Sequence, residues 1–269
     1  MIKGAVAAVL TVLALLLPLP VHAQEEVDLE LVLAVDVSLS MDYEEQKLQR
    51  EGYAAAFLDE EVIAAIRSGG YGRIAVSYME WAGVGTERLV VDWVVVDGAE
   101  TAKAFSDMLL AAPIGRYRRT SISNGLMAAG ALFQSNPYPG LRKVIDVSGD
   151  GPNNQGARVD IVRDSLVKTG ITINGLPLVL NRGGFGFFDI DDLDEYYHNC
   201  VIGGFGAFTL PVREIGKFGA AIRQKLVLEI AVAKPRIIPA QATSAATPYD
   251  CLIGEKLWEE WRGRGFEFR

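Results

Sequence analysis

The chain has 269 residues and a mass of 29.2 kDa, which is enough for one α/β domain with a small appendage. Half of its residues are hydrophobic, so a sizeable core is available and global disorder is excluded. The net charge of −8 argues against nucleic acid or an anionic membrane surface as a partner.

The first residues have the pattern of an export signal. Lys3 gives a positive start, residues 5–17 form an apolar run, and residues 21–23 (VHA) end in the small residue that a signal peptidase accepts. An uncleaved membrane anchor is the alternative, but the run falls short of the roughly 20 residues that a spanning helix needs. We therefore expect cleavage after residue 23, which leaves an exported chain, periplasmic or secreted, without a transmembrane segment.

Strand and helix patterns alternate along most of the remaining chain. Strands are predicted at 27–35, 73–81, 88–96, 142–147, 171–180 and 207–212. Helices are predicted at 42–66, 99–111, 121–134, 159–168, 193–199 and 213–231. The short glycine-containing link at 83–85 indicates a hairpin, whereas helices between strands require crossovers. The predicted fold is a doubly wound α/β domain with a mostly parallel central sheet, one antiparallel edge hairpin and helices on both faces.

The composition changes near residue 234. Residues 234–250 are rich in Pro, Ala, Ser and Thr, which is typical of a linker or an extended strap. We therefore divide the chain into a signal peptide (1–23), one α/β domain (24–233) and a C-terminal linker and strap (234–269).

The strap contains features that would attach it to the domain. Its Cys251 and the domain's Cys200 are the two cysteines of the chain, and an oxidising compartment permits a disulfide between them. Two buried free thiols are the alternative. Trp258 and Trp261 are three residues apart and would share a helix face, where packing on the domain is favoured over a partner site.

Oxygen-bearing side chains follow three separate segments of the predicted fold. Asp36 ends the first strand and is followed by Ser38 and Ser40, Thr120 opens a helix, and Asp150 ends another strand. The carboxyl ends of parallel strands meet at one rim of a sheet, where ligands collect. Hard oxygen ligands suit Mg²⁺, and Mn²⁺ or Ca²⁺ would use the same ligands. With only two carboxylates, the cation would keep positive charge and an open position for another carboxylate.

This pattern resembles a known family. Residues 36–40 (DVSLS) resemble the DxSxS motif of von Willebrand factor A (vWA) domains, whose metal-ion-dependent adhesion site (MIDAS) uses it. Thr120 and Asp150 resemble the threonine and the aspartate that this family supplies from two further loops, and the order of elements is similar across residues 27–231. In length and signal the chain also resembles a group of secreted bacterial vWA-like proteins of unknown function. The resemblance implies a doubly wound sheet, a bound divalent cation and acidic protein ligands that complete its coordination.

The loop before Thr120 departs from the pattern of many family members, which have a glycine-rich run there. This chain has Arg116, Arg118 and Arg119 instead. These arginines would help to capture an anionic group, or would compete with the cation by pairing with the two aspartates, or would form a solvated basic loop.

The predicted function is that of an exported, metal-dependent protein-binding domain, an adhesion or scaffold module and not an enzyme. Ser121 and Asn153 are additional candidates near the ion. A metal-dependent hydrolase or phosphatase is one alternative, since an acid at a strand end with Mg²⁺ serves phosphoryl transfer in other folds. Against it, Ser38 stands where a second carboxylate is expected, and His198 is the one histidine left after signal cleavage. A metal-free scaffold is the other alternative for the function. For the DVSLS motif itself, the alternative is that its serines only cap the helix that follows.

Overall fold

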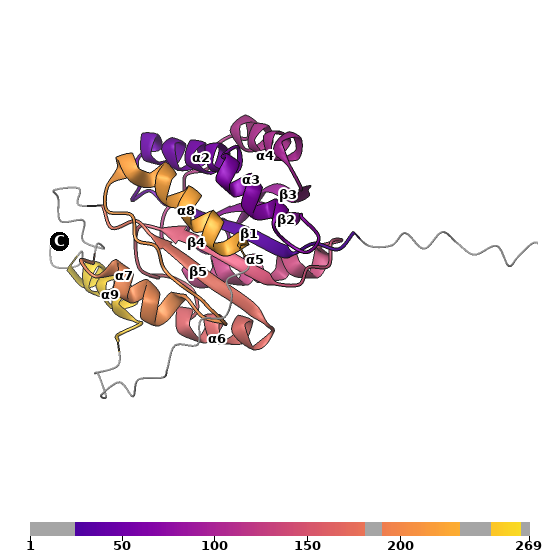
Figure 1. The fold of residues 1–269 in the computed structure, drawn as a ribbon. Coiled ribbons are helices and arrows are strands. Elements are labelled where there is room, and N and C mark those ends of the chain that lie inside the picture. The colour runs from indigo at the N-terminus through magenta and orange to yellow at the C-terminus, as the bar shows by residue number, and fades with distance from the viewer. Residues whose placement is uncertain (1–24, 181–189, 232–248, 265–269) are drawn as a thin grey trace, which may run out of the picture.

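The computed structural model describes residues 25–180, 190–231 and 249–264, whose arrangement is shown in Figure 1. The predicted signal peptide and most of the predicted linker lie outside these residues. Within the described ranges, no helix combines the length and apolarity needed to cross a membrane. The division of the chain into three parts stays a prediction.

A five-stranded sheet with the order β3-β2-β1-β4-β5 forms the centre of the molecule. Four strands run parallel, namely β1 (Leu29–Asp36), β2 (Ile74–Trp81), β4 (Lys143–Gly149) and β5 (Ile171–Pro177), and β3 (Arg88–Val96) pairs antiparallel with β2 at the edge. Every residue of β1 and β2 is buried, as near-continuous apolar strands require when both faces of a sheet are covered. The predicted mixed sheet with an antiparallel edge hairpin is therefore confirmed.

Two layers of helices cover the sheet (Figure 1). The first layer contains α2 (Tyr43–Phe57), α3 (Glu60–Arg67), α4 (Ala99–Ala111) and α8 (Phe218–Ile230). The second layer contains α5 (Ile122–Ser135), α6 (Val159–Lys168) and α7 (Leu193–Tyr196), with α9 (Ile253–Arg264) beside α7. Short 3-10 and π-helical turns occupy Ile215–Lys217 and Tyr197–Val201.

Alternation along the strands supplies two separate cores. In β1, Leu31 and Leu33 pack into the core beneath the first helix layer, whereas Val32 and Ala34 pack into the core beneath the second. This period of two places successive side chains on opposite faces of the sheet. The last residue of β1, Asp36, follows Val32 and Ala34 in this alternation, so it points to the side of the second layer.

Several predicted elements end or begin at other residues than predicted, and two differ more strongly from the structure. The helix predicted at 42–66 is interrupted near Leu58, because the carboxylate of Asp59 accepts a hydrogen bond from the Glu61 amide (2.9 Å) and caps a new helix, α3. The strand predicted at 207–212 was wrong as a regular strand. Thr209 forms an isolated bridge with Gly175 of β5 and Val212 with Leu178 just after it, and no continuous ladder joins the two segments.

A buried charge cluster attaches α8 to the sheet. Lys225 of α8 is fully buried and lies 2.6 Å from a carboxylate oxygen of Asp146 in β4, and it also pairs with Glu229 one helical turn away. Asn174 of β5 donates a hydrogen bond to Glu229 (3.0 Å). Removing one partner from such a cluster would leave an uncompensated buried charge, so the cluster holds α8 against β4 and β5.

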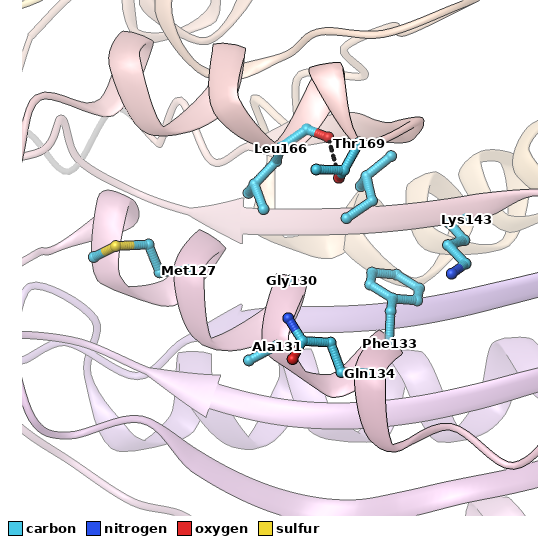
Figure 2. Close-up of a pocket in the computed structure, with 9 residues that line it drawn as sticks. Met127, Gly130, Ala131, Phe133, Gln134, Lys143, Leu166 and Thr169 are labelled. Carbon is cyan, nitrogen blue, oxygen red and sulfur yellow. Dashed lines mark hydrogen bonds between the residues drawn. The ribbon is translucent and has the colours of Figure 1, made fainter.

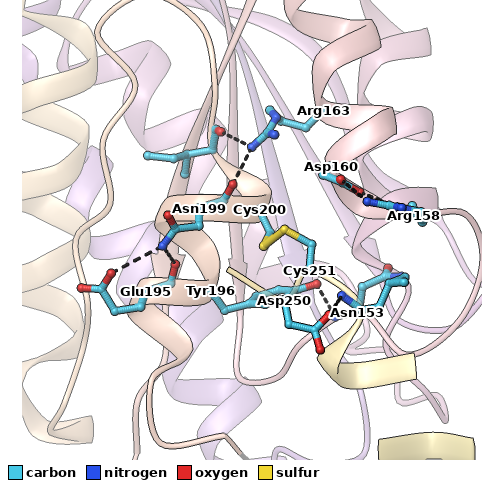
Figure 3. Close-up of a disulfide and its surroundings, with 12 residues drawn as sticks. Asn153, Arg158, Asp160, Arg163, Glu195, Tyr196, Asn199, Cys200, Asp250 and Cys251 are labelled. Atoms are coloured by element: carbon cyan, nitrogen blue, oxygen red, sulfur yellow. Dashed lines mark hydrogen bonds and ion pairs between the residues drawn. A yellow bond between two sulfur atoms is a disulfide. The ribbon is translucent and has the colours of Figure 1, made fainter. Parts of the chain in front are cut away.

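The predicted disulfide between Cys200 and Cys251 is present, and no other cysteine exists in the chain. Cys200 lies in the π-helical turn that follows α7, and Cys251 lies immediately before α9 (Figure 3). The bond therefore attaches the C-terminal helix to the second helix layer, as the sequence predicts.

Candidate functional site

The first candidate loop begins where β1 ends. Asp36 is wholly buried, and its Oδ1 accepts a hydrogen bond from the Ser38 amide (2.7 Å). Helix α2 begins after Asp42, whose carboxylate caps the Glu45 amide (2.8 Å) in a capping box. The chain between strand end and helix cap is short, which keeps Ser38 and Ser40 beside Asp36.

A chain of hydroxyl contacts joins this loop to the end of β4. The Oγ atoms of Ser38 and Ser40 are 2.7 Å apart, and the Ser40 hydroxyl donates to Oδ1 of Asp150 (2.7 Å). Asp150 is itself nearly buried. The aspartate predicted from the third segment therefore lies next to the serines of the first.

Thr120 reaches the same rim through the loop between α4 and α5. Its amide donates to the side chain of Asn154 (3.0 Å), and the Asn154 amide donates back to the Thr120 carbonyl (2.8 Å). A Cβ placed on Gly151 would lie 4.0 Å from Thr120 Oγ1, so the threonine hydroxyl faces the residue that follows Asp150. A short bridge between Tyr117 and Ser38 attaches this loop to the first one. All five predicted residues therefore meet at the carboxyl rim of the sheet.

Two carboxylates, Asp36 and Asp150, lie close enough at this rim to affect each other electrostatically. Burial, followed by the negative charge of Asp150, raises the pKa of Asp36 well above its usual range. Oδ2 of Asp36 has no hydrogen-bond partner among the described residues. A buried carboxylate oxygen without a partner costs free energy, and a bound cation would remove that cost. The donor set fits a hard cation on these grounds.

The side chains at this rim determine which ligands a bound cation would have. No cluster of three or more His, Cys, Asp or Glu side chains suited to a metal occurs within the described ranges. Any ion at this rim would depend on the hydroxyls of Ser38, Ser40 and Thr120 beside the two carboxylates. Such a ligand set is typical of Mg²⁺ or Mn²⁺ and not of a zinc site rich in histidine or cysteine.

The two additional candidates support the loops. Ser121 caps α5, accepting from the Asn124 amide, and its hydroxyl donates to the Gln155 carbonyl (2.9 Å). The Asn153 side chain accepts from the Ser123 amide (3.0 Å) and donates to Glu255 of α9 (2.7 Å). Both side chains therefore hold the second and third loops to each other, and Asn153 also attaches them to α9.

The arginines of the second loop make contacts other than ion pairs with the site. Arg116 donates to the Met41 carbonyl (3.0 Å), and the Arg119 guanidinium lies 3.4 Å from the ring centre of Trp258. Arg119 also has a positive φ of 76°, an uncommon backbone conformation for a residue with a side chain. Competition with a cation by direct pairing of these arginines with the two aspartates is not observed among the described residues.

Sequence reasoning expected the C-terminal helix to pack on the domain but missed its contacts with the candidate loops. Gly254 packs so closely that a Cβ there would lie 2.1 Å from the Asn153 carbonyl oxygen, and Glu255 accepts from the Asn153 side chain. Trp258 supports Arg119 in the loop that leads to Thr120. Figure 3 shows Asn153 beside the segment that carries Asp250 and Cys251. The helix therefore contacts two of the three candidate loops. In the sequence, the cysteine pair and the spacing of Trp258 and Trp261 indicate packing on the domain but not on these loops.

Tyr197 is a second residue that sequence reasoning missed. The Tyr197 hydroxyl and Asp36 Oδ2 both lie against Gly149 of β4. A Cβ atom added to this glycine would be 2.8 Å from the hydroxyl and 3.0 Å from Oδ2. The hydroxyl is buried and has no hydrogen-bond partner within the described part of the chain. Burial and the charges of Asp36 and Asp150 raise the pKa of this tyrosine. His198 beside it is exposed, in agreement with a surface role.

A separate cavity of about 370 Å³ lies between α5 and α6, lined mainly by apolar groups such as Met127, Phe133 and Leu166 (Figure 2). Lys143 and Ile171, the first residues of β4 and β5, also line it. The cavity therefore lies at the amino ends of these strands, opposite the rim that carries the candidate residues.

Residues 26–234 match a family described as a protein of unknown function (DUF1194). The chain belongs to this vWA-like family. No curated protein matches the chain. The family assignment confirms the predicted resemblance and leaves the activity to be argued from the site.

Solved structures of vWA proteins share the fold at low sequence identity. Proximal thread matrix protein 1 from the mussel byssus is 14% identical, covers 77% of this chain and has a TM-score of 0.54. The von Willebrand factor type A protein from Catenulispora acidiphila is 14% identical over 76% (TM-score 0.51), and the pilus adhesin SpaC from Lactobacillus rhamnosus GG is 12% identical over 77% (TM-score 0.53). The matches cover 49%, 43% and 31% of those chains, so this chain spans less than half of their length. Another structure of the mussel protein is described with a zinc-occupied MIDAS motif.

Proposed function

We propose that this chain is an exported protein-binding module whose rim holds a divalent cation between Asp36, Ser38, Ser40, Thr120 and Asp150. The observation that carries the proposal is the convergence of these side chains from three loops around buried Asp36, whose Oδ2 has no hydrogen-bond partner in the described ranges. The cation supplies a positive charge that the chain's own groups only partly neutralise. A carboxylate of a partner protein then completes its coordination.

The chain's own residues have distinct parts in this function. The Ser38 amide orients Asp36, and the contact between Ser40 and Asp150 keeps the first and third loops together. Asn154 fixes the backbone of Thr120 from both sides. These contacts set the positions of the ligands before an ion binds, which reduces the free-energy cost of assembling the site.

The comparisons support a binding role over an enzymatic one. One vWA neighbour is named as a pilus adhesin and another as a matrix protein of the mussel byssus, and the latter has a structure with a metal-occupied MIDAS motif. Mg²⁺ is the proposed ion here because its preferred ligands are oxygen atoms, including retained water. The disulfide is consistent with an exported chain.

Calorimetric titration of the purified chain with Mg²⁺ and with Mn²⁺ tests the proposal. We expect one binding event in the unmodified chain and none in Asp36→Ala, while Asp107→Ala, which removes an exposed carboxylate of α4, binds like the unmodified chain. Absence of heat in the unmodified chain would instead favour the metal-free scaffold. Turnover of a phosphoester panel that disappears in Asp36→Ala would favour the hydrolase.

A further inference from the structure

Four arginines around the candidate metal rim have no acidic partner within the described part of the chain. Arg116, Arg118 and Arg119 precede Thr120, and Arg262 lies in α9, one helical turn beyond Trp258. The contacts of this group are the Met41 carbonyl for Arg116 and the Trp258 ring for Arg119, with no carboxylate among the described residues.

The basic side chains elsewhere on the surface behave differently. Several of them pair with carboxylates, including Arg73, Lys103, Arg158, Arg213, Lys217 and Lys256. Pairing is the expected outcome in a chain that has 34 acidic and 26 basic side chains. Four arginines beside one rim that pair with no described carboxylate are therefore a local excess of positive charge on an acidic protein.

The contacts of α9 and the second loop keep this excess in place. The Arg119 guanidinium stacks on Trp258, and the disulfide at Cys251 attaches α9 to the domain. Arg262 lies one helical turn beyond Trp258 in α9, so the helix that holds Arg119 also carries this second arginine. An anionic group bound between the two guanidinium groups would offset their like charges.

Arg116, Arg118 and Arg262 are exposed, so their guanidinium groups are accessible to a partner. Arginine presents a planar set of donors that matches carboxylates in two-point contacts. Arg118 follows Tyr117, whose bridge to Ser38 places this loop directly beside the first ligand loop. The positive surface therefore continues outward from the position of the proposed cation.

We propose that the partner is a protein segment with several clustered carboxylates, of which one binds the cation and the others bind the surface formed by Arg116, Arg118, Arg119 and Arg262. The inference rests on the proposed function for the first carboxylate and adds the class of partner. A segment with a single acid would use the cation alone, whereas an acid-rich segment gains from the arginines as well. The arginines also accelerate association through electrostatic steering.

Fluorescence anisotropy with two labelled peptides tests this inference. One peptide carries a single Asp in a Gly/Ser background and the other carries four consecutive Asp residues. In Mn²⁺ buffer we expect the purified chain to bind the acid-rich peptide roughly tenfold more tightly, with stronger dependence on salt. Arg118→Gln/Arg262→Gln should reduce this preference by about threefold to tenfold, since exposed ion pairs each contribute modestly.

Matched controls separate the arginine surface from the cation. Lys103→Gln/Lys168→Gln removes the same charge from α4 and α6 and should leave the preference unchanged. Calorimetric Mn²⁺ binding by Arg118→Gln/Arg262→Gln should equal that of the unmodified chain. Acid-rich binding that survives chelator and Asp36→Ala but is lost in the arginine variant would support the surface while contradicting the cation.

Other outcomes would overturn the inference. Equal affinity for the two peptides in Mn²⁺, or an undiminished preference in Arg118→Gln/Arg262→Gln, contradicts a role for the arginines. Binding to vesicles of anionic phospholipid without any preference for the acid-rich peptide would identify a membrane surface instead, and would equally contradict it.

Discussion

Removal of the Cys200–Cys251 disulfide is the perturbation whose effect follows most directly from the structure. The bond closes a loop with a sequence separation of 51 residues. In the chain-entropy treatment, a cross-link over a loop of this length lowers the entropy of the unfolded chain enough to stabilise the fold by about 4 kcal/mol at 25 °C. We therefore expect Cys200→Ala/Cys251→Ala to lower the free energy of unfolding by up to about 4 kcal/mol.

Urea denaturation followed by circular dichroism measures this loss, and reduction of the unmodified chain with dithiothreitol should reproduce it. Trp258→Ala serves as the comparison, because it keeps the disulfide and removes the ring beneath Arg119, at an expected cost of about 1 kcal/mol. Released α9 should also become susceptible to proteolysis near Trp258. A double-cysteine variant with undiminished stability would refute the view that the bond holds α9 on the domain.

Two further predictions concern buried polar groups. Burial and the charge of Asp146 raise the pKa of Glu229 from its ordinary 4.5 to about 7, so folding favours the protonated acid. This contribution to the free energy of unfolding is complete below pH 4.5 and is lost as the pH rises through 7. The free energy of unfolding of Glu229→Gln should therefore fall less over this pH range than that of the unmodified chain. Urea denaturation that gives the same fall for both proteins would contradict this prediction. Tyr196→Phe should cost about 1–3 kcal/mol, because the buried Asn153 amide donates to that hydroxyl, whereas Tyr197→Phe should cost less. Equal losses in thermal denaturation would show that the Tyr197 hydroxyl has a partner in solution.

The sequence predicts the strands that carry the site well, because they are predominantly apolar and are followed by polar residues. Strand β1 ends at Asp36, with Ser38 and Ser40 after it, and β4 ends just before Asp150. Parallel pairing then brings both strand ends to one rim. Helices α4 and α6 were predicted with the same bounds that the structure has, since glycine, proline and polar residues flank both.

The elements that the sequence does not predict depend on long-range contacts. The break near Leu58 results from a cap at Asp59 that competes with a continuous helix pattern. Residues 207–212 are apolar enough to predict a full strand. In the structure they pair with β5 and the residue after it only at Thr209 and Val212, and this limit is set by the neighbouring segment and not by residues 207–212 themselves. The packing of Trp258 on Arg119 joins residues more than a hundred positions apart, which no local pattern encodes.

The most direct test of the proposed metal site is an anomalous-difference map from crystals of the chain grown with Mn²⁺. The account predicts one strong peak at the carboxyl rim, about 2.2 Å from oxygen atoms of ligands drawn from Asp36, Ser38, Ser40, Thr120 and Asp150. A map with no peak at this rim at saturating Mn²⁺, or with an arginine guanidinium seated against Asp36 in its place, would contradict it.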